Sequence, residues 1–184
     1  MEGVPAPAFS EDFQGGVMPP GCLLIDNDGL PVSPNVSQFT DAWIVAEDFD
    51  NPGDFVAMST SWYLPAGTSD DWMITPDISI GPNMELTWRA EAQDPAYPDG
   101  YNVHISTTGQ SIAGCQANPP LFSIPAETGG VWTDRSASLA AYDGQLVNIC
   151  FQNNSNDQFI LMIDDIVVDT VPGYDAAVTA VDPM

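Results

Sequence analysis

The sequence contains no lysine, and its only basic side chains are two arginines, Arg89 and Arg135. Against them stand 26 aspartates and glutamates, which give the 184-residue chain a formal net charge of −24. Such a negative surface repels nucleic-acid phosphates and anionic lipid headgroups, so the composition argues against nucleic acid and membranes as partners. The acids are typical of a solvated surface suited to a salty medium, and they also offer oxygen ligands to divalent cations. The two interpretations are compatible.

Long hydrophobic runs and helical periodicity are also nearly absent. No apolar run approaches the roughly 18 residues that a membrane-spanning helix needs, so no membrane insertion is expected. The opening residues, "MEGVPAPAFSEDF", lack the basic and apolar regions of a signal peptide. Only "RSASLAAY", at residues 135–142, is typical of a helical turn, and it fits a strand equally well.

Cysteine and histidine are scarce as well. The three cysteines, Cys22, Cys115 and Cys150, show no C-x-x-C spacing, which argues against a zinc ribbon or a redox motif. One disulfide with one remaining thiol is compatible with this number, but the sequence leaves the pairing open. The single histidine, His104, is more typical of a strand's surface than of a general base, so we assign no catalytic residue.

What the sequence does contain is a strong period of two. In "MELTWRAEAQ", residues 84–93, apolar and polar side chains alternate, which predicts a half-buried β-strand. The pattern recurs at 101–107 and 145–153, while 159–168 is apolar on both faces. Shorter candidate strands are 8–13, 22–25, 43–46, 55–59, 72–75 and 121–124. With turn-forming Pro and Gly between them, these segments predict an all-β sandwich.

The chain length suits one domain with a substantial core. We expect residues 1–8 to form an N-terminal tail and residues 9–170 to form the sandwich. From residue 171 the sequence "VPGYDAAVTAVDPM" breaks at Pro-Gly and then begins a new alternating pattern. We interpret residues 171–184 as a linker or the start of a following module, so the chain is predicted to be part of a larger protein.

Two adjacent aspartates interrupt the apolar run "LMIDDIVV" at residues 161–168. In a regular strand Asp164 and Asp165 lie on opposite faces, each among apolar neighbours. A buried carboxylate without compensation costs several kcal/mol, and this chain has almost no basic partners to offer. Protonation, hydrogen bonds from turn amides and simple exposure remain alternatives. We favour a hard divalent cation, which prefers carboxylate and carbonyl oxygens.

Further acids are needed for such a site, because calcium binds about six to eight oxygens. The segment "FSEDF" supplies Glu11 and Asp12, and "IDNDG" supplies Asp26 and Asp28. The second segment is similar to the beginning of an EF-hand loop. However, the twelfth position from Asp26 is Ser37 instead of a bidentate glutamate, and no flanking helices are predicted. An EF-hand is therefore rejected, and these acids stay candidates for a site of another kind.

The aromatic residues divide into two groups. Trp72, Trp88 and Trp132 are expected in the core. The others lie in or near loops rich in Pro, Gly and Asp, where exposed rings can stack on sugars or anchor a protein partner. The alternative is that they cover the ends of the sandwich. The candidate ligand-binding residues are Trp43, Trp62, Tyr63 and Tyr97.

Acidic pairs such as Asp70–Asp71 and Asp94–Asp99 have the composition of a glycosidase site. In a chain with 26 acids, such pairs arise readily by chance. Asp70 and Asp71 are also candidates for a second cation site. An acidic-pair hydrolase is therefore kept only as an unfavoured alternative.

Several longer motifs follow one another in order. They are "FSEDFQGGVMPPGCLLIDNDG", "DDWMITPDISI", "LTWRAEAQDPAYPDGYNVHISTTG" and "LAAYDGQLVNICFQNNSNDQFILMIDDIVV". Over residues 9–168 the chain resembles the cleaved-adhesin or choice-of-anchor-J family of secreted bacterial proteins. It is similar, more distantly, to the MAM domains of animal cell-surface proteins. The resemblance implies a jelly-roll sandwich whose first and last strands lie close together.

The resemblance also implies structural calcium held by acids of those strands. The positions that match are Glu11, Asp12, Asp26, Asp28, Asp164 and Asp165. The cysteines do not match the four-cysteine pattern of MAM domains, so no disulfide is carried over.

The resemblance implies a non-catalytic, calcium-stabilised recognition or adhesion module of a larger protein, secreted or displayed on the cell surface. We expect its partners to be a glycan or a cell-surface protein, together with neighbouring modules of the parent protein. A role as a structural subunit or module of a surface assembly, which includes self-assembly, is the first alternative.

Overall fold

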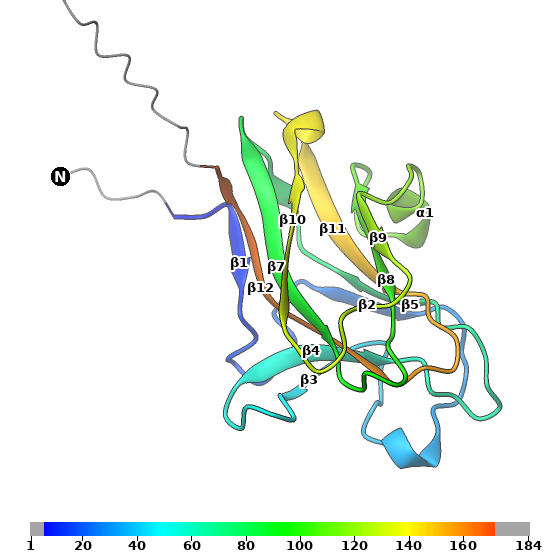
Figure 1. The fold of residues 1–184 in the computed structure, drawn as a ribbon. Coiled ribbons are helices and arrows are strands. Elements are labelled where there is room, and N and C mark those ends of the chain that lie inside the picture. Colours follow the sequence, from blue (N-terminus) through cyan, green and yellow to red (C-terminus); the bar gives the residue numbers. More distant parts are fainter. Residues whose placement is uncertain (1–5, 172–184) are drawn as a thin grey trace, which may run out of the picture.

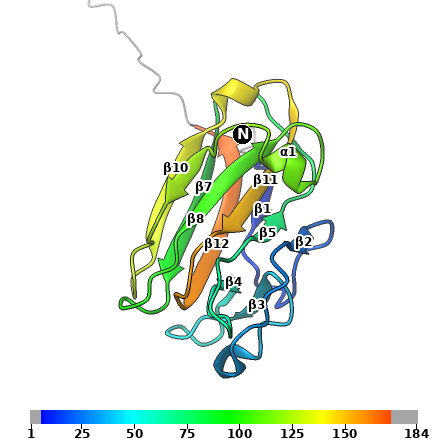
Figure 2. The ribbon, with the colours of Figure 1, turned by 90° about the vertical axis from the view of Figure 1, so that its right-hand side faces the viewer.

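The computed structural model describes residues 6–171. They form a sandwich of two antiparallel β-sheets, shown from two sides in Figures 1 and 2. The predicted jelly-roll β-sandwich is therefore confirmed. The predicted following module and most of the predicted N-terminal tail lie outside the described residues. No helix between residues 6 and 171 is long and apolar enough to cross a membrane.

The first sheet, sheet A, is built around the longest strand, β12 (Ile160–Thr170). Strand β7 (Met84–Ala92) pairs with one edge of β12 along most of its length. The other edge pairs first with β4 and then with β1, so the opening and closing strands are neighbours. The order of the strands is β10-β7-β12-β4-β3, and β1 pairs with β12 outside this order. The remaining strands of sheet A are β1 (Phe9–Glu11), β3 (Ile44–Glu47), β4 (Phe55–Thr60) and β10 (Thr133–Ser138).

The second sheet, sheet B, has the order β2-β5-β11-β8-β9, and β6 pairs with β11. Its strands are β2 (Leu23–Asp26), β5 (Asp71–Ile74), β6 (Ile78–Ser79), β8 (Tyr101–Ser106), β9 (Phe122–Ile124) and β11 (Leu146–Asn153). Between residues 6 and 171, three short helical segments lie in the loops: η1 (Pro34–Val36), α1 (Ile112–Cys115) and η2 (Ala140–Tyr142).

The hydrophobic core lies between the two sheets, because every second side chain of a strand points to the same face. In β7 the side chains of Leu86, Trp88 and Ala90 are buried in the same cluster as Val103 and Ile105 of β8. Each large apolar side chain buried in this way contributes about 1.5–3 kcal/mol. The alternation in the sequence thus fixes which face of each sheet turns inward.

All the candidate strands are present, with shifts of one or two residues at their ends. Strand β6 was missed, and β10 was anticipated only as one of two outcomes for residues 135–142. The sequence of β10, "TDRSAS", is short and polar, so its side chains give little sign of a strand. The strand forms because its backbone pairs with β7. Residues 135–142 contain both expected outcomes, since β10 ends at Ser138 and η2 follows.

Helix α1 covers the outer face of sheet B. Cys115 at its end is bonded to Cys150 of β11, with their Cα atoms 6.1 Å apart, and Cys22 is a free thiol. Beneath this cover His104 is buried, with its ring 5.4 Å from that of Trp72. The expected surface position of His104 is therefore wrong, because a segment with no helical signal folds over it.

A β-bulge interrupts β12 at the double aspartate. The pairing register with β7 shifts between Asp164 and Val167, and Asp165 has a positive φ of 50°. Ile163 before the bulge and Ile166 after it both belong to the core. The inserted residue therefore leaves Asp164 and Asp165 together outside the core, and the expectation that they lie on opposite faces is corrected.

Candidate functional site

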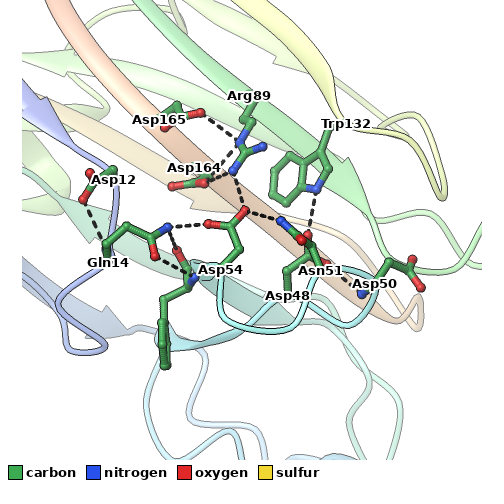
Figure 3. A network of polar contacts seen from close by, with 11 residues as sticks. Asp12, Gln14, Asp48, Asp50, Asn51, Asp54, Arg89, Trp132, Asp164 and Asp165 are labelled. Carbon is green, nitrogen blue, oxygen red and sulfur yellow. Dashed lines mark hydrogen bonds and ion pairs between the residues drawn. The ribbon is translucent and has the colours of Figure 1, made fainter.

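The two aspartates at the bulge share one arginine. Arg89 lies directly across from Asp164 in the β7–β12 register. Its guanidinium donates from Nε at 3.1 Å and from Nη2 to Oδ2 of Asp164. It also pairs with Asp165, at 3.0 Å, and with Asp54, at 2.9 Å. Figure 3 draws these contacts. An arginine partner, which the composition made scarce, is therefore present here.

Arg89 is held in turn by an aromatic ring. Its guanidinium carbon lies 4.6 Å from the ring centroid of Trp132, a cation–π arrangement. The indole Nε1 of Trp132 donates to Oδ2 of Asp48 at 3.0 Å (Figure 3). Burial raises the pKa of Asp164 to about 6, although the neighbouring Arg89 favours its ionised form. The carboxylate is thus compensated only in part.

The acids of the opening strand lie next to the bulge. Glu11, Asp12 and Asp165 line a shallow pocket of about 290 Å³ between β1 and β12. One oxygen of Glu11 accepts the amide of Phe13 at 2.7 Å, and one oxygen of Asp12 accepts the amide of Gln14 at 3.2 Å. Turn amides thus take one oxygen of each acid. The first and last strands bring these three predicted ligands together.

A second acidic cluster lies on sheet B, where Asp26 of β2 pairs in register with Asp71 of β5. Carboxylate oxygens of Asp26, Asp28 and Asp71 all lie within 4.8 Å of one another. Asp71 is buried and accepts hydrogen bonds from the Tyr63 hydroxyl at 2.7 Å and from the Ser69 hydroxyl at 3.2 Å. Burial, with the nearby charges of Asp28 and Asp26, raises the pKa of Asp71 to about 7.

The predicted metal ligands therefore form two groups on different sheets instead of one site. Glu11, Asp12 and Asp165 meet on sheet A, with Asp164 paired to an arginine beside them. Asp26 and Asp28 meet Asp71 on sheet B. The sequence placed Asp71 only in a possible second cation site, and the register of β2 with β5 is what joins it to the others.

Two of the four candidate ligand-binding aromatics are buried. Trp43 belongs to the core, and its indole donates to the backbone oxygen of Asp71 at 3.2 Å. Tyr63 is buried with its hydroxyl on the Asp71 carboxylate. The prediction that they offer an exposed stacking surface is wrong, because both rings pack under the loops as the alternative interpretation had it.

The other two aromatics line an open pocket of about 460 Å³. Trp62, Tyr97 and Phe159 supply its aromatic walls. Tyr97 is 56% exposed, and the rings of Trp62 and Phe159 meet edge to face with centroids 5.6 Å apart. The remaining lining residues are Asp94, Asp157 and Gln158. We refer to this as the aromatic pocket.

Three loops build the aromatic pocket at the end of sheet A where β4 and β7 finish and β12 begins. Sequence reasoning found Trp62 and Tyr97 but assigned Phe159 to the strand. The signal for Phe159 was available, since it directly follows the polar turn "NNSNDQ" and is therefore the first residue at the sheet's end.

A buried polar network fixes the backbone around the aromatic pocket. The Ser61 hydroxyl donates to Oδ1 of Asp99 at 2.6 Å and accepts the amide of Gln158 at 3.1 Å. The amide of Phe159 donates to the backbone oxygen of Tyr97 at 3.2 Å. These bonds join all three loops. Asp99 is fully buried, and its burial raises its pKa to about 7.

The chain is an all-β sandwich with an aromatic pocket among its loops. The chain belongs to the Cleaved Adhesin Domain family, whose model matches residues 7–168. It is 27% identical over 182 residues to Hemagglutinin A of Porphyromonas gingivalis. That match covers 87% of this chain but only 7% of the length of the relative. The resemblance to the cleaved-adhesin family is thus confirmed.

Solved structures show the same fold. The K1 and K3 cleaved adhesin domains of Lys-gingipain from P. gingivalis W83 superpose with TM-scores of 0.66 and 0.67 at 21% identity. Each comparison covers 89% of this chain, and 98% and 97% of those chains respectively.

Carbohydrate-binding modules are more distant neighbours of this fold. The CBM22-1 xylan-binding domain from Paenibacillus barcinonensis Xyn10C gives a TM-score of 0.56 at 9% identity, covering 91% of this chain and 96% of that one. TmCBM61 in complex with β-1,4-galactotriose gives 0.52 at 10%, covering 87% and 94%.

Replacing Arg89 tests the pairing at the bulge. Arg89→Ala leaves the buried Asp164 carboxylate without its partner, which typically costs about 3–5 kcal/mol. We expect the free energy of unfolding, measured by urea titration, to fall by about that amount. Arg89→Ala combined with Asp164→Asn should recover a large part of the loss. Equal destabilisation in the single and double variants would contradict the pairing.

The buried Asp99 predicts an unusual pH dependence. Its folded-state pKa of about 7 lies above the ordinary value of about 3.9, so the native state binds this proton more tightly than the unfolded state. Its contribution to stability is therefore present at pH 4 and is lost as pH rises through about 7. In chelator, Asp99→Asn should raise the melting temperature at pH 8 more than at pH 5. The exposed Asp143→Asn should show no such difference.

Proposed function

We propose that the chain is a non-catalytic recognition module of a larger secreted or surface-displayed adhesin, and that it binds a glycan in the aromatic pocket. The observation that carries the proposal is the open pocket walled by Trp62, Tyr97 and Phe159. Membership of the cleaved-adhesin family supports the adhesive role. The fold shared with carbohydrate-binding modules supports a sugar as the ligand.

The chemistry of the pocket suits a sugar ring. Aromatic faces pack against the apolar C–H face of a pyranose, and the nearby Asp94, Asp157 and Gln158 offer hydrogen-bond partners to its hydroxyl groups. The volume of about 460 Å³ falls in the range of about 300–1,000 Å³ typical of small-ligand sites. Because buried hydrogen bonds already fix the loops, the loops lose little conformational freedom when a ligand binds.

A catalytic role has less support. His104, the only histidine of the chain, is buried on sheet B and supplies no base to the aromatic pocket. Asp94 and Asp157 lie in the pocket but serve equally well as hydrogen-bond acceptors for a bound sugar. Turnover of a glycan or peptide by the isolated chain would overturn the non-catalytic assignment.

Substitutions in the aromatic pocket test the proposal. On a glycan array, the unmodified chain should bind a defined set of sugars. Trp62→Ala and Tyr97→Ala should each weaken that binding at least about tenfold, as expected when a buried aromatic contact is removed. Phe49→Ala is the matched control, since Phe49 is an aromatic residue 47% exposed outside the pocket.

Two results would contradict glycan recognition. Absence of binding across the array is the first. The second is assembly that depends on protein concentration and needs no ligand, which would support the structural alternative of a self-associating surface module.

We further propose that calcium stabilises the sandwich at its acidic clusters. The donors present fit a hard cation, because they are all oxygens. Among the described residues, Asp26, Asp28 and Asp71 are the acids whose oxygens lie close enough together to hold one ion, and Glu11, Asp12 and Asp165 would hold a second where they line the pocket between β1 and β12. Oδ1 of Asp164 is buried without a hydrogen-bond partner in the described part of the chain, so charge at the bulge remains to be compensated. The ion would supply positive charge that the sequence lacks.

Removing calcium should lower the stability of the protein. A ligand bound only by the folded state adds about 2.7 kcal/mol when its concentration is 100 times its dissociation constant. We therefore expect a lower melting temperature in EDTA than in millimolar calcium. Asp71→Asn and Asp165→Asn should each reduce this difference, whereas Asp143→Asn should not. Identical melting curves with chelator and with calcium would refute the proposal.

A further inference from the structure

The aromatic pocket contains negative charge and no positive charge. Asp94 and Asp157 are its only ionisable lining residues apart from the Tyr97 phenol. The chain has no lysine, and both arginines are occupied elsewhere. Arg89 pairs with acids at the bulge, and Arg135 pairs with the buried Glu127. A ligand bearing a carboxylate or sulfate therefore finds no protein cation to bind at this pocket.

The two carboxylates have oxygens to offer. Oδ1 of Asp94 accepts the amide of Ala96 at 2.8 Å, and the described residues engage its other oxygen in no hydrogen bond. Asp157 is exposed in a turn with a positive φ of 53°, and no described residue donates to its carboxylate. Neither acid is held in an ion pair between residues 6 and 171. Both are available to a ligand.

We propose that the aromatic pocket selects glycans that carry a protonated amine, such as a 2-amino-2-deoxyhexose, and discriminates against carboxylated or sulfated sugars. This inference rests on the proposed glycan-binding function and specifies the class of sugar. Its basis is the combination of two unpaired carboxylates with three aromatic walls.

Both kinds of group favour an ammonium ion on a sugar. A cation near the face of Trp62 or Tyr97 is attracted by the ring's quadrupole. A carboxylate accepts a charge-assisted hydrogen bond from an ammonium group, and such bonds are roughly twice as strong as neutral ones. The net charge of −24 adds long-range attraction for cations and repulsion for anions. The sugar ring can meanwhile stack as a neutral sugar would.

Oligosaccharides matched in length test this inference. The probes are a β-1,4-linked glucosamine oligomer, its fully N-acetylated counterpart and an oligogalacturonate, titrated at about pH 6 by calorimetry. We expect the amine-bearing oligomer to bind about tenfold more tightly than the acetylated one, with no measurable binding of the galacturonate. The preference should shrink as salt screens the charges.

Variants separate the charge contribution from the stacking contribution. Asp157→Asn and Asp94→Asn should each reduce the preference for the amine about threefold, within the range of a partly exposed ion pair, because each weakens binding of the amine-bearing oligomer more than binding of the acetylated one. Asp143→Asn keeps the same net charge as these variants but lies outside the pocket, so it should leave the preference intact. Trp62→Ala should abolish binding of both oligomers.

The outcomes distinguish the two proposals. Equal, Trp62-dependent binding of amine and acetylated oligomers would overturn the amine preference and leave glycan recognition standing. Amine binding that survives Trp62→Ala would also overturn it, because it would reflect general attraction to an acidic protein. If no oligosaccharide binds while a lysine-rich peptide binds in a Trp62-dependent manner, both proposals fail and the partner is a protein.

Discussion

The pairing of Arg89 with Asp164 is the interaction on which sheet A depends. It joins the two strands with the most extensive pairing, β7 and β12, at the point where a bulge shifts their register. The same guanidinium reaches Asp54 in the loop between β3 and β4, and it lies on the ring of Trp132 before β10 (Figure 3). One cation thus fastens four segments that are distant in sequence.

The second arginine, on β10, also forms an ion pair with a buried carboxylate, and β10 pairs with the other edge of β7. Arg135 of β10 pairs with the buried Glu127, whose carboxylate also accepts a hydrogen bond from Tyr101 of β8. Both arginines of the chain therefore form ion pairs within the domain. Most of the 26 acids are left without a basic partner, which is the physical reason to look to cations from solution.

The sequence predicted the sandwich because apolar and polar residues alternate in most of its strands, but it did not predict the bulge. A single inserted residue changes which face every later side chain occupies, and only pairing with β7 reveals it. Asp164 and Asp165 therefore reach one arginine instead of facing opposite ways. The sequence also did not predict that Trp43 and Tyr63 are buried, because their burial depends on how the loops pack against the sheets. Trp62 and Tyr97, which the sequence placed in or near loops, line an open pocket.

The internal ion pairs and the aromatic pocket that we propose as the ligand site lie in different parts of the molecule. The ion pairs of Arg89 and Arg135 join strands and their adjacent loops. The loops of the aromatic pocket are instead joined by backbone hydrogen bonds and by Ser61, which also donates to the buried Asp99. Because neither Asp94 nor Asp157 pairs with an arginine, changes at these positions leave the internal ion pairs intact. The charge of the aromatic pocket can therefore change, and with it the class of ligand that we propose for it, while the internal ion pairs stay in place.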